Sequence, residues 1–198
     1  MARVATLPMS EWRSDLREMV GGDNATLVEQ GLVRVLSHNP DLAAGLLGFG
    51  AKLYQSTSLP RRLLELVRLR VAFHNQCRSC MAIRYQSAMD DGLSEGMVCS
   101  LERPEEADDL SPAEKAALAY ADISSTNHFA IDDSTFDALR PHFTESEIVE
   151  LGAFIAFCIG FGRLAAAWHL VDDLPDGYQR EDGMAIAPWR EDSVQVRG

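Results

Sequence analysis

The sequence predicts an all-α protein, and three observations support this prediction. Apolar residues recur at intervals of about 3.6 along most of the chain, and no segment alternates apolar and polar residues as a half-buried strand would. Two capping boxes, Ser111 to Glu114 and Thr144 to Glu147, are typical of helix starts. Proline also stands where a first helical turn favours it, as at Pro60. We therefore expect helices packed around the core of a single domain.

The first half of the chain is expected to hold three helices. The first follows Asn39-Pro40 and covers about 41–54. The second covers about 60–74 and is apolar on most sides, which predicts a buried helix. The third begins near Cys77 and ends at Gly92, because glycine is a favourable residue after a helix C-terminus.

The second half is expected to hold three more helices. One follows the first capping box and covers about 111–124, and a shorter one over 133–140 ends before Pro141. The longest begins after the second capping box and continues to about 170. Its glycines lower helix propensity and are expected to permit close helix packing; they are Gly152, Gly160 and Gly162.

The most apolar stretch is too short to cross a membrane. Leu151–Gly162 has 12 residues between Glu150 and Arg163, whereas a transmembrane helix needs about 20. The N-terminus lacks the apolar core of a secretory signal. We therefore expect a cytoplasmic protein, in which thiols stay reduced unless redox cycling is their function.

Composition and patterning also bear on domains and partners. Residues 1–32 are expected to form an N-terminal helical arm, 33–170 the helical domain, and 171–198 an irregular arm that could lie on a neighbouring subunit. Phenylalanines and isoleucines of the longest helix point to different sides, which predicts a homo-oligomer. The net charge of −12 argues against a nucleic acid or an anionic membrane as the main partner.

Cys77 and Cys80 are the residues that suggest chemistry. Thiols three residues apart share a helix face, and in a first helical turn they can close a disulfide. The helix N-terminus also favours a thiolate. If the helix continues, Arg84 lies on the same stripe, where its guanidinium would stabilise that thiolate further. This reasoning leaves open which cysteine is the nucleophile.

Glu65 is the candidate proton-transfer residue upstream of the cysteines. A carboxylate inside a buried apolar helix should have a raised pKa and could exchange protons near neutral pH. Alternatively, Glu65 pairs with Arg61 or Arg68 on a solvated stripe of that helix.

The spacing from Glu65 to Cys77 and Cys80 resembles that of the AhpD-like / carboxymuconolactone decarboxylase family of all-helical alkylhydroperoxidase-like proteins. The likeness extends over about 33–170, and three stretches carry it: LPRRLLELVRLRVAFHNQCRSCMAIR, LSPAEKAALAYADISS and FDALRPHFTESEIVELGAFIAFCIGFGRLA. The resemblance implies an oligomeric AhpD-like helical bundle.

The resemblance also implies a thiol-dependent peroxidase or disulfide oxidoreductase. Cys80 would attack a small hydroperoxide, Cys77 would resolve the sulfenic acid, and a dithiol reductant would restore both thiols. Glu65 would accept the proton that activates Cys80. The family pattern has a histidine where this chain has Arg84, which cannot relay a proton. His74 is the histidine nearby that could replace it, unless it is a surface or capping group.

Two other functions remain as alternatives. One is a carboxymuconolactone decarboxylase-like lyase, against which the CxxC pair counts. The other is a non-enzymatic oligomerisation module with a stress-sensing thiol pair. No cofactor is expected, and a zinc site is not expected because no second ligand cluster accompanies the pair. Cys99 and Cys158 are expected to be inert, and Arg163 to pair with a carboxylate or face a pocket or interface.

Overall fold

The computed structural model describes residues 2–197, and within them helices dominate. The α-helices are α1 (Ser14–Met19), α2 (Leu27–Gln30), α3 (Val33–Leu36), α4 (Pro40–Gln55), α5 (Arg61–Asn75), α6 (Arg78–Ala82), α7 (Gln86–Asp90), α8 (Glu95–Ser100), α9 (Pro112–Thr126), α10 (Asp133–Leu139), α11 (Glu145–Trp168) and α12 (Asp176–Gln179). Short 3₁₀ turns are η1 (Met9–Glu11), η2 (Gly22–Asn24), η3 (Pro104–Glu106) and η4 (His128–Ala130). Two short strands, β1 (Ile83–Tyr85) and β2 (Val194–Val196), pair in parallel.

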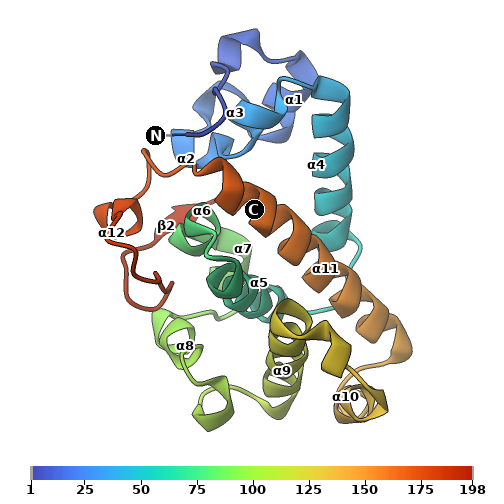
Figure 1. Cartoon of the computed structure of the whole chain (residues 1–198). Coiled ribbons are helices and arrows are strands. Elements are labelled where there is room, and N and C mark those ends of the chain that lie inside the picture. Colours follow the sequence, from blue (N-terminus) through green and yellow to red (C-terminus); the bar gives the residue numbers. More distant parts are fainter. Residues whose placement is uncertain (1, 198) are drawn as a thin grey trace.

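Helix α5 is the centre of the core. It packs mainly against α9 and α11, and ten of its residues are buried. Figure 1 shows α11 crossing the molecule diagonally, with α4 standing beside it and α9 and α10 at one end. The main core joins leucines of α5 to α9 and to the first half of α11.

The main helices predicted from the sequence are confirmed. Helices α4, α5, α9, α10 and α11 begin and end within about two residues of their predicted bounds. Both predicted capping boxes form, since Ser111 and Thr144 accept from the amides of Glu114 and Glu147, whose carboxylates bond back. The fold class is therefore all-α, as predicted.

The single helix predicted from Cys77 to Gly92 is wrong. Helix α6 ends at Ala82, β1 follows in extended conformation, and α7 begins only at Gln86. The pairing partner of β1 is β2, more than a hundred residues later, with Ile83 opposite Val194 and Tyr85 opposite Val196. A local helical pattern could not reveal this pairing, because the strand exists only where the two segments meet.

The terminal segments fold onto the domain. Trp12 and Leu16 are buried against Val33, Leu36 and Ala43 in a small second core. The C-terminal segment, expected to be an irregular arm, packs in part on its own chain. We call residues 186–197 the strap; it runs beside α6 and ends at β2 (Figure 1).

Helix α11 has 24 residues, and within the described range it alone is long and apolar enough to cross a membrane by those two criteria. A core helix of a water-soluble protein meets the same criteria. Ile148, Leu151, Phe154, Ile155 and Ala165 of α11 are buried inside this fold, but only 33% of its most apolar window is buried, so one face of the helix lies in the core and the rest is open.

Candidate active site

The loop that carries the cysteines begins where α5 ends. Gln76 adopts a left-handed conformation with φ of 50°, which stops α5 and turns the chain into α6. Its side chain bonds both backbone groups of Ile186, accepting from the amide at 2.9 Å and donating to the carbonyl at 3.1 Å. The strap therefore holds the entrance of the cysteine loop.

Cys77 and Cys80 are joined by a disulfide, with Cα atoms 5.2 Å apart. Cys77 is the N-cap of α6 and accepts from the Cys80 amide. The two residues differ in access, because Cys77 is fully buried whereas Cys80 is partly exposed. A reactant can approach the pair only from the side of Cys80.

That side opens onto a cavity of about 240 Å³. Its walls come from α2, α3, α4, α5, α6, β1 and α11 and from the segment after α11, and they are mainly apolar. The polar residues of the lining include Arg68, Tyr54, Tyr85 and Ser79, and Cys158 also lines the cavity. A thiol-bearing cavity with an apolar wall and a few polar groups suits a small organic molecule.

Glu65 and Arg68 form a buried ion pair beneath this cavity. Arg68 donates to both carboxylate oxygens, at 2.6 and 2.7 Å, and Glu65 is 1% exposed. The pairing of Glu65 with Arg68 is thus as anticipated, but the solvated stripe is wrong because both side chains are buried. Burial alone would lower the pKa of Arg68, but the charge and hydrogen bonds of the Glu65 carboxylate outweigh burial. The pKa of Arg68 is therefore above its ordinary value.

The ion pair also fixes the backbone of the cysteine loop. Arg68 donates to the carbonyls of Cys80 and Ile83, and Glu65 accepts from the Tyr85 amide at 3.1 Å. Both Glu65 oxygens are therefore occupied. The sequence reasoning treated Arg68 only as a pairing partner; the signal it offered was the i,i+3 spacing within a buried helix.

Burial dominates the titration of the other polar groups in the cavity. It raises the pKa of Tyr54 well above its ordinary value and that of Tyr85 as well, although the nearby Arg68 charge opposes the rise at Tyr85. Burial also raises the pKa of the Cys158 thiol to about 12. These three groups are neutral near pH 7 and can donate hydrogen bonds.

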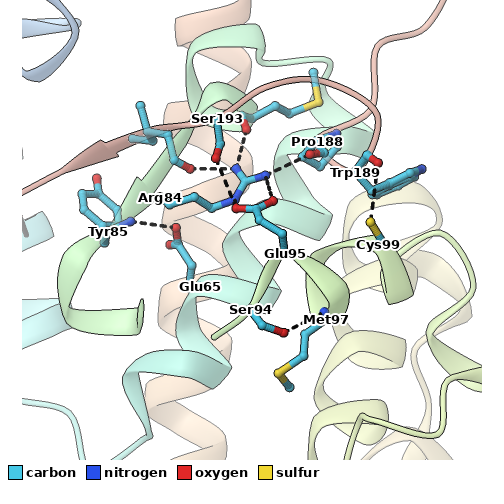
Figure 2. A network of polar contacts seen from close by, with 12 residues as sticks. Glu65, Arg84, Tyr85, Ser94, Glu95, Met97, Cys99, Pro188, Trp189 and Ser193 are labelled. Carbon is cyan, nitrogen blue, oxygen red and sulfur yellow. Dashed lines mark hydrogen bonds and ion pairs between the residues drawn. The ribbon is translucent and has the colours of Figure 1, made fainter. Parts of the chain in front are cut away.

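Arg84 does not share a helical stripe with the cysteines. It lies in β1 and is fully buried on the opposite side, where it pairs with Glu95 at 3.1 Å and donates to the carbonyls of Met81 and Pro188 (Figure 2). The extended backbone turns alternate side chains to opposite faces, so Arg84 points away from the cavity that Tyr85 lines. The cation beside Cys80 is Arg68.

His74 faces another part of the core. Its Nε2 lies 2.7 Å from an oxygen of Asp122, which Arg70 also binds. Burial raises the pKa of Asp122, but hydrogen bonds from His74 and Arg70 outweigh burial and hold it below its ordinary value. His74 is not among the residues that line the cavity, so the geometry does not bring it to Cys80.

Comparison with known proteins agrees with this geometry. Residues 40–122, which include Glu65 and both cysteines, match the carboxymuconolactone decarboxylase family model. Over this segment the chain is similar to the carboxymuconolactone decarboxylase family. The recognition made from the spacing of Glu65, Cys77 and Cys80 is confirmed.

Two curated relatives in this comparison have no characterised activity. An uncharacterised protein of Mycobacterium tuberculosis is 38% identical over 117 residues, which cover 58% of this chain and 40% of the mycobacterial protein. The uncharacterised protein YdfG of Bacillus subtilis is 28% identical over 117 residues, covering 59% of this chain and 80% of YdfG. The match therefore spans well under half of the mycobacterial relative.

Solved structures identify the fold of the family segment and its surroundings as AhpD-like. A peroxidase-related protein of Ralstonia eutropha with an alkylhydroperoxidase AhpD core aligns with a TM-score of 0.73 at 19% identity, covering 89% of this chain and 94% of that one. An Agrobacterium tumefaciens protein of unknown function, provisionally described as antioxidant defence protein AhpD, aligns at 0.59 and 25%, covering 67% and 91%. The debrominase Bmp8 aligns at 0.67 and 22%, covering 84% and 89%.

Proposed function

We propose that this chain is a thiol-dependent hydroperoxide reductase that cycles Cys77 and Cys80 between dithiol and disulfide. The observation that carries the proposal is the disulfide itself, with one sulfur-bearing residue on the wall of a small apolar cavity and the other buried behind it. The AhpD-like fold and the description of one structural relative as peroxidase-related support it.

The difference in access supports the assignment of roles. In the reduced protein the Cys80 thiolate attacks the terminal oxygen of a hydroperoxide, which breaks the O–O bond and leaves a sulfenic acid on Cys80. The Cys77 thiol then attacks that sulfur and water leaves, which forms the disulfide. Cys77 is three residues away and shielded from solvent, which suits an internal resolving thiol. A dithiol donor would attack the Cys80 sulfur to close the cycle.

Glu65 is part of this proposal in a changed form. Because both its oxygens are engaged by Arg68 and by the Tyr85 amide, it accepts a proton from Cys80 only if one of these bonds opens. While these bonds are intact, the role of the Glu65–Arg68 pair is to position Cys80, because Arg68 donates to the Cys80 carbonyl.

Counting thiols tests the function. The reduced protein has four cysteines, and one equivalent of cumene hydroperoxide should remove two thiols and release one equivalent of cumyl alcohol. The Cys80→Ser variant should lose no thiol at the wild-type rate. The Cys77→Ser variant should reduce one equivalent of peroxide and hold a sulfenic acid on Cys80 that dimedone traps. Oxidation of Cys77 in the Cys80→Ser variant at the wild-type rate would reverse the assignment.

The same assay separates the alternatives. A lyase of the decarboxylase type would leave all thiols intact while it consumes a lactone. A stress-sensing module would lose two thiols once, but no dithiol donor would restore turnover. Cys99→Ser is the matched control, because Cys99 is exposed on α8 and does not line the cavity.

A further inference from the structure

Two phenol groups in the cavity have no hydrogen-bond partner among the residues that the structure describes. Tyr54 and Tyr85 both line the cavity with Cys80, and no hydrogen bond to either phenol oxygen forms within residues 2–197. The described chain has one sealed side-chain polar atom without a partner, Nε1 of Trp189. The phenol oxygens are therefore not sealed, and they open onto the cavity.

Packing fixes these phenols in position. The Tyr54 ring meets the Tyr85 ring edge-on at 5.6 Å and the Phe154 ring at 5.3 Å. The backbone of Tyr85 is held by Glu65, and the Arg68 guanidinium lies 5.1 Å from the Tyr85 ring centre. Rigid aromatic rings that present unpaired hydroxyls to an apolar cavity are suited to bind an oxygen-bearing ligand.

The proposed reaction needs such groups. When a hydroperoxide R–O–OH is cleaved, the inner oxygen leaves as an alkoxide that must gain a proton. Arg84 and His74 lie outside the cavity, and the arginine cannot give up a proton in any case. Arg34 and Arg68, the two arginines that line the cavity, have the same limit.

We propose that Tyr54 and Tyr85 bind the oxygens of an organic hydroperoxide and that Tyr85 protonates the departing alkoxide. This inference rests on the proposed function. The Cys80 thiolate forms an S–O bond to the terminal oxygen, the O–O bond breaks, and its electron pair leaves on the inner oxygen. Tyr85 gives that oxygen its proton, the alcohol departs, and the phenolate regains from water the proton that Cys80 released on ionising.

Tyr85 is the donor of the two because Arg68 lies over its ring. A phenolate formed there is stabilised by the guanidinium, and the same charge opposes the rise in the Tyr85 pKa. Tyr54 then supplies the second hydrogen bond to the peroxide. The body of the ligand would lie along Leu47, Phe157 and Phe161, which face the same cavity.

Leaving-group chemistry tests the proposal. The reduced wild-type protein and the Tyr85→Phe variant are mixed with cumene hydroperoxide, whose leaving alkoxide needs a proton. They are also mixed with 3-chloroperoxybenzoic acid, whose carboxylate leaving group does not. The rate of Cys80 oxidation in Tyr85→Phe should fall on the order of 100-fold with the hydroperoxide, a typical loss for a general acid. With the peroxyacid it should change by less than about threefold, because proton transfer no longer limits that reaction.

Equal slowing with both oxidants, or no slowing with either, would overturn the proton-transfer role. Failure of the wild type to react with either oxidant faster than free cysteine would instead overturn the proposed function. Tyr54→Phe should slow oxidation by the hydroperoxide more than by the peroxyacid, by a smaller factor than Tyr85→Phe.

The variants are expected to fold, because phenylalanine keeps the ring contacts and neither hydroxyl has a hydrogen bond to lose within residues 2–197. Equal thermal midpoints would confirm this. Tyr120→Phe is the matched control: Tyr120 lies on α9 beside Phe136 and does not line the cavity, so its removal of a hydroxyl should leave both rates unchanged.

Discussion

The charge of Arg84 suits it to stabilise a thiolate, but the extended backbone of β1 directs its side chain away from Cys80. Its charge and its distance in sequence from Cys80 favoured thiolate stabilisation on a continuous helix. In β1 the same side chain enters the space between α8 and the strap, where it bonds Glu95 and the Pro188 carbonyl (Figure 2). The neighbouring Tyr85 faces the cavity instead.

We therefore expect Arg84→Met to loosen the strap and to leave Cys80 reactivity unchanged. The substitution removes the bond to Pro188 and leaves buried carbonyls unpaired, which should lower the free energy of unfolding by on the order of 3 kcal/mol. Trypsin should then cut after Arg190 faster than in the wild type. The control is Arg103→Met, since Arg103 makes only an exposed pair with Glu106. A changed pH dependence of Cys80 alkylation in the reduced Arg84→Met protein would restore the original expectation for Arg84.

At the scale of elements, the contact between α5 and α11 depends on one glycine. A Cβ atom on Gly162 would lie 2.6 Å from Nδ2 of Asn75. Asn75 cannot move away at no cost, because that nitrogen donates to the Cys158 carbonyl and its oxygen accepts from Arg163. The expectation that Arg163 pairs with a carboxylate is thus replaced by its bonds to Asn75 and to the Ser125 carbonyl.

Gly162→Ala should destabilise the protein by about 1 to 3 kcal/mol, the usual cost of overpacking. Gly160→Ala, two residues earlier on the same helix, meets nothing within 4 Å and should stabilise by up to about 1 kcal/mol, since alanine favours helix. Urea unfolding of the two variants measures whether the free energy of unfolding falls in Gly162→Ala and rises in Gly160→Ala. A stabilised Gly162→Ala would contradict the close contact.

The sequence predicted those elements whose signals are local. The capping boxes of α9 and α11 and the apolar pattern of α5 depend on neighbouring residues, so their bounds were predictable. The break after Ala82 was not, because β1 depends on pairing with a strand far along the chain. The spacing of Glu65 and the cysteines is also a local signal, and it was enough to recognise the family. The positions of Tyr54 and Tyr85 were not predictable, because they depend on the packing of α4 against the cysteine loop.

At the scale of the whole molecule, α4 and α11 leave apolar side chains exposed. Only Ala43 of the 16 residues of α4 is fully buried, and Tyr54 is partly buried. Leu42 and Phe49 on α4 are 54% and 52% exposed, and Val149 on α11 is 71% exposed. Apolar helices with so little cover inside their own chain favour a subunit interface.

We predict a homo-oligomer that depends on α4. Light scattering should give a mass that is a multiple of the 21.8 kDa chain, and Leu42→Lys should shift it towards the monomer because a charge opposes apolar contact. Phe129→Lys is the control, since Phe129 is 89% exposed and lies outside both helices. A monomeric wild type at micromolar concentration would contradict the prediction.

The strap also has a consequence for the order in which the structure is acquired. Cys77 and Cys80 are three residues apart, so their bond can close as soon as α6 turns, whereas the contact from Gln76 to Ile186 spans 110 residues. Contacts between distant segments cost more chain entropy and form late in folding. Before the contact from Gln76 to Ile186 forms, the sulfurs of Cys77 and Cys80 are both expected to be accessible to an oxidant. In the folded protein Cys77 is buried and Cys80 is partly exposed, so this difference in access is expected to arise only late in folding.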